Sequence, residues 1–225
     1  MKFGVLRFPG SCDDLDALAA ARRVGEGELI WHGERDLKGA DAIVIPGGFS
    51  YGDYLRAGAI ARFSPAMESV IAFAGEGGLV LGICNGFQVL CEAHLLPGAL
   101  LGNANRRFTF RQLELEVVQV DSAFTCACAR GGRLSIPAKH AWGRYYADDR
   151  TLQAIEESGQ VLLRYARGQN FNGSLHDIAG VRNEEGNVFG LMPHPEHAVD
   201  ELTGGSADGL RIFESMRLNV EGARA

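Results

Sequence analysis

The chain has 225 residues, a net charge of −6, 46% hydrophobic residues and 22% charged residues. A chain of this length and composition can bury a globular core without disulfides or metals. Its negative charge argues against a nucleic-acid partner, and no apolar run is long enough to span a membrane. The five cysteines are irregularly spaced, which predicts free thiols and a cytoplasmic protein.

Strands and helices are predicted to alternate in the first half of the chain. Short apolar runs are typical of strands covered on both faces, and amphipathic segments predict the helices between them. This order predicts an α/β fold with a flavodoxin-like, mostly parallel sheet flanked by helices. The predicted strands are residues 3–8, 28–32, 40–45 and 79–83, and the helices are residues 13–24 and two that begin at Pro65 and near Asn85.

The second half is richer in strands. Leu113–Val120 alternates apolar and polar residues, which suits a sheet with one wet face, and extra antiparallel strands are expected there. With no repeat or linker, residues 1–225 are predicted to form a single domain. The other predicted elements are strands at 134–136, 161–165, 178–182 and 188–191, and a helix at 207–218.

Cys84 lies at the junction of a predicted strand and a predicted helix, in the sequence Gly82-Ile83-Cys84-Asn85-Gly86. This arrangement predicts a nucleophile elbow with cysteine in place of serine. Small neighbours permit the sharp turn, and the start of the helix favours a thiolate. The alternative is a buried structural cysteine, which we assign to Cys91 on the same helix.

A base and its orienting group are expected in Pro193-His194-Pro195-Glu196, which follows a predicted strand. If this segment is extended, His194 and Glu196 point to the same side, and His197 points away. Glu196 could then accept the Nδ1–H of His194. All three candidate residues follow strands, where the active sites of α/β folds are found.

The turn at Pro46-Gly47-Gly48 also follows a strand. Glycines leave backbone N–H groups uncovered, so the N–H of Gly48 could join that of Asn85 in a two-donor oxyanion hole. The alternative is an ordinary tight turn.

Four segments together resemble the glutaminase subunits of phosphoribosylformylglycinamidine synthase, a family of class I, triad-type glutamine amidotransferases. The resemblance covers nearly the whole chain. The segments are "PGGFSYGDYLRAGAIAR", "GICNGFQVL", "IPAKHAWGRY" and "FNGSLHDIAGVRNEEGNVFGLMPHPEHAVD".

The resemblance implies that Cys84 attacks the carboxamide carbon of L-glutamine, that His194 relays protons and that Glu196 orients His194. It further implies that the backbone N–H groups of Gly48 and Asn85 contact the oxyanion. Gln88, one helical turn past Cys84, is implied to contact the amino-acid end of glutamine. No glutamine contacts are assigned within residues 105–117, which match the family less closely.

The same resemblance implies the partners. Ammonia would pass to a large synthetase subunit that uses ATP and Mg to make formylglycinamidine ribonucleotide, and a small third subunit would complete the complex. No cofactor or metal is expected on this chain; Cys126 and Cys128 lack a second ligand pair and are interpreted as structural. Two alternatives stay open: a flavodoxin-like cysteine hydrolase or chaperone, and a binding module with a vestigial elbow.

Overall fold

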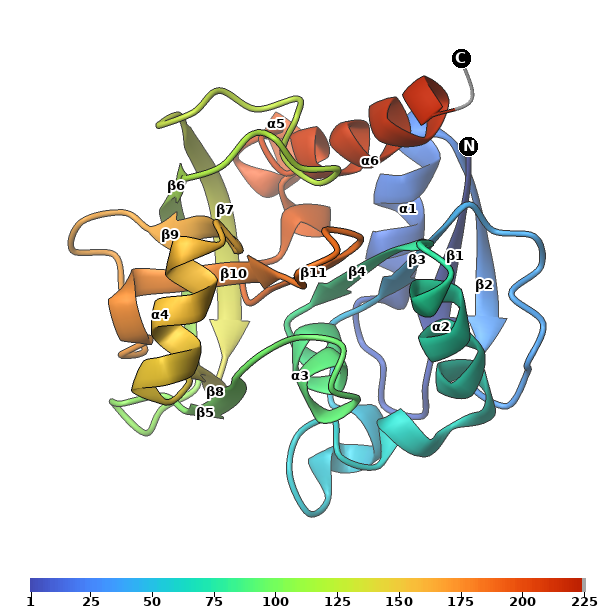
Figure 1. Cartoon of the computed structure of the whole chain (residues 1–225), viewed down its shortest axis with the longest axis horizontal. Helices are drawn as coiled ribbons and strands as arrows, with labels where there is room; N and C mark the ends of the chain where they lie inside the picture. The colour runs from blue at the N-terminus through green and yellow to red at the C-terminus, as the bar shows by residue number, and fades with distance from the viewer. Residues whose placement is uncertain (224–225) are drawn as a thin grey trace.

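A nine-stranded mixed sheet organises the molecule, for which the computed structural model describes residues 1–223 (Figure 1). Its strand order is β2-β1-β3-β4-β11-β10-β9-β6-β7, and β5 and β8 form a separate pair. The strands are β1 (Lys2–Arg7), β2 (Glu26–Trp31), β3 (Ala42–Ile45), β4 (Leu79–Ile83), β5 (Ala99–Gly102), β6 (Thr109–Val117), β7 (Arg133–His140), β8 (Trp142–Tyr146), β9 (Val161–Tyr165), β10 (Ile178–Arg182) and β11 (Val188–Leu191).

Helices and short 3-10 turns connect these strands. The α-helices are α1 (Asp14–Val24), α2 (Pro65–Gly75), α3 (Asn85–Glu92), α4 (Asp149–Glu157), α5 (Glu201–Gly204) and α6 (Leu210–Ala223). The 3-10 turns are η1 (Ser50–Asp53), η2 (Ala61–Phe63), η3 (Leu175–Asp177) and η4 (Pro195–His197). Within residues 1–223, none of these helices has the length and apolar character needed to cross a lipid bilayer.

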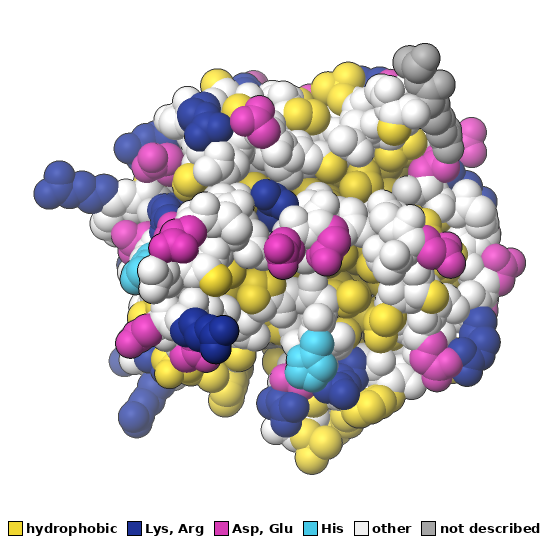
Figure 2. Space-filling view, viewed as in Figure 1, with side chains coloured by type: hydrophobic (Ala, Val, Ile, Leu, Met, Phe, Trp, Pro, Cys, Tyr) yellow, Lys and Arg dark blue, Asp and Glu magenta, His cyan; other side chains and the backbone are white. Residues whose placement is uncertain are grey.

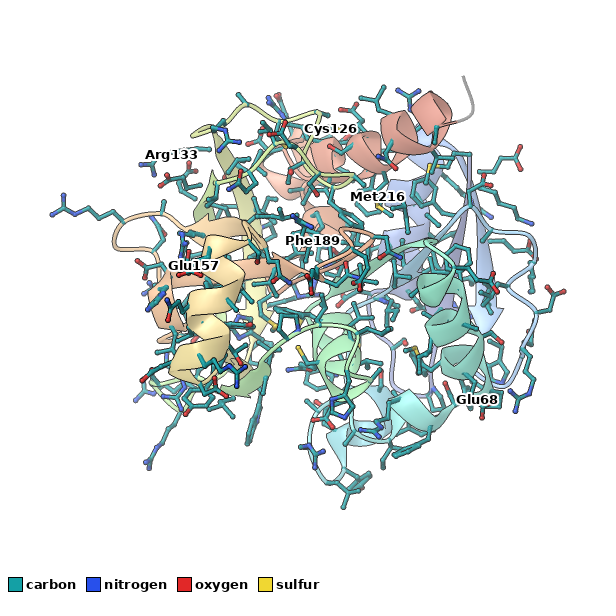
Figure 3. The ribbon with its side chains drawn as sticks, in the orientation of Figure 1. Glu68, Cys126, Arg133, Glu157, Phe189 and Met216 are labelled. Atoms are coloured by element: carbon teal, nitrogen blue, oxygen red, sulfur yellow. The ribbon has the colours of Figure 1, made fainter. Side chains whose placement is uncertain are left out.

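The first five strands of the sheet, β2, β1, β3, β4 and β11, are parallel to one another. Three of them, β3, β4 and β11, consist entirely of buried residues, as expected for strands covered on both faces. Helices α1 and α6 pack together on one face, and α2 and α3 cover the other (Figure 1). Phe189 of β11 and Met216 of α6 are fully buried between these layers (Figure 3).

The remaining strands, β10, β9, β6 and β7, are antiparallel. This confirms the predicted fold class of a mostly parallel sheet with antiparallel additions. The antiparallel part continues the sheet from β11, and its last strand, β7, contacts the turn that follows β11. There the His194 N–H donates to Pro137 O of β7 at 2.7 Å. The additions therefore supply a wall of the site described below.

Several predicted boundaries are wrong. The strand expected at 113–120 is Thr109–Val117, because it pairs with β7 residue by residue from Thr109 opposite His140 to Glu116 opposite Arg133. Its first residues are mostly exposed and carry no apolar pattern. The last helix begins at Leu210 and continues to Ala223. Strands β5 and β8 and helix α4 were not predicted.

Candidate active site

Cys84 occupies the sharp turn that the sequence predicts. It follows the last residue of β4 and precedes α3, and its backbone angles, φ 50° and ψ −103°, lie outside the regions that non-glycine residues usually adopt. The Cys84 N–H donates to Leu191 O at 2.8 Å. Because β4 and β11 pair in parallel, this bond fixes the elbow beside the end of the strand that leads to His194.

Gly86 lets α3 begin close to the end of β3. A Cβ atom at Gly86 would lie 2.0 Å from the carbonyl oxygen of Ile45, a backbone atom that cannot move aside. We therefore expect Gly86→Ala to lower the free energy of unfolding by about 1–3 kcal/mol or more, measured by urea denaturation. Gly75→Ala is the matched control, because a Cβ at Gly75 meets nothing within 4 Å. Equal stabilities of the two variants would contradict the close approach.

His194 and Glu196 contact each other as predicted, although the segment between them is not extended. Pro195–His197 forms the 3-10 turn η4, with Pro195 at its first position, where proline is compatible with helical geometry. His194 Nδ1 lies 2.7 Å from Glu196 Oε1. Since a carboxylate can only accept, the ring donates from Nδ1, and Nε2 is left to act as a base.

The other ring nitrogen of His194 faces the cysteine. His194 is 1% exposed, and within residues 1–223 its Nε2 has no hydrogen-bond partner. Burial alone lowers the pKa of His194, but the negative charges of Glu196 and of the Cys84 sulfur outweigh burial and raise that pKa well above its usual range. The elbow and η4 thus bring a thiol, an imidazole and a carboxylate together.

The turn after β3 presents Gly48 to the same site. Gly48 and Ser11 form an isolated antiparallel bridge whose flanking bonds are Cys12 N–H to Gly47 O, at 3.2 Å, and Phe49 N–H to Gly10 O, at 2.9 Å. In this type of bridge the N–H of the central residue points away from the partner segment. The Gly48 N–H is therefore directed away from Ser11, and Gly48 lines the same pocket as Cys84.

The side chain of Asn85 ties this turn to α3. Its Oδ1 accepts from the Ser50 N–H at 2.9 Å and from Ser50 Oγ at 2.5 Å. Its Nδ2 donates to Asp53 Oδ1 at 3.1 Å and to Gln88 Oε1 at 2.8 Å. Ser50 and Asp53 were not predicted as site residues. Their contacts hold the turn that carries Gly48 against the helix that carries Asn85.

A pocket of about 150 Å³ opens above Cys84. Gln88 lines it, but its amide is already engaged, since Nε2 donates to Trp142 O at 2.5 Å. Phe108 also lines the pocket, so the segment 105–117, to which no contact was assigned, does reach the site. Figure 2 shows a notch at the lower edge of the molecule, with hydrophobic side chains on its left rim and a basic side chain on its right rim.

Four further residues surround the site that sequence reasoning did not place there. His197 was expected to point away from His194, but the two rings pack with their centroids 5.3 Å apart. The reason is that the 3-10 turn η4 does not place successive side chains on opposite sides, as an extended segment does. Asp13 and Lys139 lie beside these rings. His140 lines the pocket, and burial together with the charge of His194 lowers its pKa to about 3, so it is neutral.

Cys12 lines the pocket with Cys84, and Cys91, Cys126 and Cys128 do not. The structural role of these three stays a prediction. Cys91 is buried within α3, and Cys126 packs against α6, where its Sγ lies 3.5 Å from Ser215 O (Figure 3). Burial raises the pKa of Cys91, as it does that of Cys128 to about 11, which makes thiolates unfavourable there.

Comparisons with known proteins agree with this geometry. A model of the CobB/CobQ-like glutamine amidotransferase domain matches residues 1–217. The fold and the elbow are thus those of a glutamine amidotransferase. The phosphoribosylformylglycinamidine synthase subunit PurQ of Corynebacterium efficiens is 55% identical over 215 residues, with 95% of this chain and 96% of that protein covered.

A second PurQ subunit, from Rubrobacter xylanophilus, is 57% identical and covers 96% of this chain and 97% of that protein. Among solved structures, a chain of PurLQS from Thermotoga maritima superposes with a TM-score of 0.88 at 43% identity, covering 97% of each chain. The chain belongs to the PurQ family of phosphoribosylformylglycinamidine synthase subunits.

Proposed function

We propose that this chain is the glutaminase subunit of a phosphoribosylformylglycinamidine synthase and that Cys84, His194 and Glu196 are its catalytic triad. The enzyme is a glutamine amidotransferase of purine biosynthesis, as membership of the PurQ family requires. The observation that carries the site assignment is the convergence of a strained elbow cysteine, a buried imidazole and a carboxylate 2.7 Å from that imidazole.

The chemistry follows from the positions of these groups. The thiol proton moves from Cys84 Sγ to His194 Nε2, and the thiolate attacks the carboxamide carbon of L-glutamine. The N–H groups of Gly48 and Asn85 stabilise the oxyanion. Collapse of this intermediate expels ammonia, which takes its proton from His194, and leaves a glutamyl thioester. Water, activated by His194, then releases glutamate.

The contact of Gln88 with the amino-acid end of glutamine stays a prediction. The bonds of the Gln88 amide to Asn85 and Trp142 hold it in place, so we assign it to shaping the end of the pocket that receives the amino-acid part of glutamine. Asp53, whose carboxylate lines the same pocket, would face the substrate ammonium group. Burial raises the pKa of Asp53, and a bound ammonium would favour its charged form.

The subunit delivers ammonia to a synthetase partner. The name of the Thermotoga maritima complex, PurLQS, indicates that its PurQ chain assembles with two further subunits. We extend that assembly to this chain as a large synthetase subunit and a small third subunit. We propose that ATP and Mg are bound by the synthetase, that this chain needs no cofactor, and that the complex acts in the cytoplasm.

An electrophilic glutamine analogue tests the site assignment. We expect it to label Cys84 in the assembled complex. Cys91, which is buried, and Cys12, which lines the same pocket but whose pKa burial and the charge of Asp13 raise, should stay unmodified. Excess glutamine should prevent the labelling. Peptide mass spectrometry identifies the modified residue, and modification that falls on Cys12, or that glutamine does not prevent, would refute the proposed site.

A further inference from the structure

Asp13 is a buried carboxylate beside His194 that the proposed triad does not use. Its side chain is 5% exposed, and it directly precedes α1. Asp13 Oδ2 lies 3.6 Å from His194 Nδ1, the same nitrogen that donates to Glu196 Oε1 at 2.7 Å. One edge of the imidazole therefore faces two carboxylates that come from opposite ends of the chain.

Lys139 and His197 hold Asp13 in this position. Asp13 Oδ1 accepts from Lys139 Nζ at 2.5 Å and lies 3.2 Å from His197 Nε2. His197 Nε2 is also 3.8 Å from Glu196 Oε1. Two imidazoles thus alternate with two carboxylates, and Lys139 adds a fixed positive charge.

Four residues here have side chains of the kinds that bind metal ions: Asp13, His194, Glu196 and His197. One nitrogen or oxygen atom from each lies within 4.8 Å of the corresponding atoms of the other three. These atoms are already hydrogen-bonded to one another, His194 with Glu196 and His197 with Asp13. The Lys139 ammonium group also donates a hydrogen bond to Asp13. A cation in contact with Asp13 opposes a second cation there. We therefore interpret the cluster as an ion-pair network.

The surroundings keep Asp13 ionised. Burial raises its pKa, but the hydrogen bond with His197 and the charges of His194 and Lys139 outweigh burial and hold that pKa well below its usual range. Gly47 makes the approach to His194 sterically feasible. A Cβ at Gly47 would lie 2.4 Å from Asp13 Oδ2 and 2.7 Å from His194 Cε1.

We propose that Asp13 is a positioning residue that stabilises the imidazolium of His194 while Cys84 is a thiolate. The inference rests on the triad proposed above. The step is the transfer of one proton from Cys84 Sγ to His194 Nε2, and no other bond changes. Glu196 holds the Nδ1–H directly, and Asp13 adds a second negative charge where the positive charge forms.

The expected pH dependence follows from the groups that face His194. Because Asp13 lies against the imidazole, its negative charge chiefly opposes loss of the imidazolium proton at high pH. Removing that charge should therefore shift the alkaline limb of the pH profile of kcat/KM to lower pH. The charged and titratable groups around His194 come from four segments: Cys84 after β4, Asp13 before α1, Lys139 and His140 on β7, and Glu196 and His197 on η4.

The variant Asp13→Asn tests this role, because it keeps the shape of the side chain and removes the charge. We expect kcat/KM for glutamine in the assembled complex to fall about tenfold, and the alkaline limb of its pH profile to move about one unit lower. KM and ammonia-dependent synthesis should change little. Asp13→Glu restores the charge and should return the limb toward its original position.

Asp14→Asn is the matched control. Asp14 is the neighbouring buried carboxylate and pairs with Arg7 rather than with the triad, so its loss should affect stability without moving the pH profile. Lys139→Met is an independent variant with the opposite sign: with Asp13 no longer neutralised, the alkaline limb should move to higher pH.

The outcomes separate this inference from the proposed function. An unchanged pH profile in Asp13→Asn, or a profile that moves equally in Asp14→Asn, would show that Asp13 acts only structurally. If Asp13→Asn does not fold, an unmoved or lowered alkaline limb in Lys139→Met would overturn the inference. Glutaminase activity that survives removal of the Cys84 sulfur would instead overturn the triad itself.

Discussion

Replacing Cys84 by serine is expected to abolish glutamine-dependent synthesis and to spare synthesis from added ammonia. A serine hydroxyl ionises far less readily than a thiol and is a weaker nucleophile when its proton has to pass to His194. We expect the glutamine-dependent rate of the assembled complex to fall by at least about 10³-fold. Product formation from glutamine and from ammonium chloride is measured side by side.

Cys91→Ser is the matched control for this variant. Cys91 lies on the same helix, is buried, and has a thiol whose pKa burial raises, so its replacement should lower stability and keep both activities. Loss of both activities in Cys84→Ser would indicate that Cys84 is structural. Retention of both would indicate a different nucleophile.

Replacing Glu196 by glutamine should have the second-largest effect. Glu196 Oε1 accepts from His194 Nδ1 at 2.7 Å, which keeps the lone pair of the ring on Nε2. An amide lacks the negative charge and can donate to Nδ1, which would place the ring proton on Nε2 and remove the base. We expect the glutaminase kcat to fall by about 10²–10⁴-fold.

Glu201→Gln, an exposed acid five residues further along the chain, is the control and should keep full activity. Measurements of kcat and KM separate the two possibilities. A fall in kcat with KM nearly constant supports an orienting role, whereas a rise in KM at constant kcat would show that Glu196 only binds substrate.

The residues of the proposed triad could be selected from the sequence because each part has a local signal. Cys84 lies between an apolar strand and a helix with a glycine two residues away on each side, and His194 and Glu196 share one short segment. The parallel pairing of β4 with β11 then brings them together. The extended conformation expected of the segment was wrong, because Pro195 begins a 3-10 turn. The expected orientation of His197 was wrong for the same reason.

The environment of the triad could not be predicted in the same way. Asp13 contacts Lys139 across 126 positions and His197 across 184 positions, and no periodicity in the sequence relates such distant residues. The strands β5 and β8 were missed because they are short and partly exposed. Tertiary contacts stabilise the two strands more than their local pattern indicates. Helix α4 was missed although it has a local signal, the N-cap Asp148 followed by the buried pair Leu152 and Ile155.

During turnover the Cys84 sulfur is expected to become covalently bonded to the glutamyl group of the substrate. The most direct measurement mixes the assembled complex with isotopically labelled glutamine, quenches it in acid within the first turnovers and locates the label by peptide mapping. We predict a glutamyl thioester on the peptide that contains Cys84, discharged by hydroxylamine. Rapid release of labelled glutamate with Cys84 unmodified, or a thioester on another cysteine, would contradict the account.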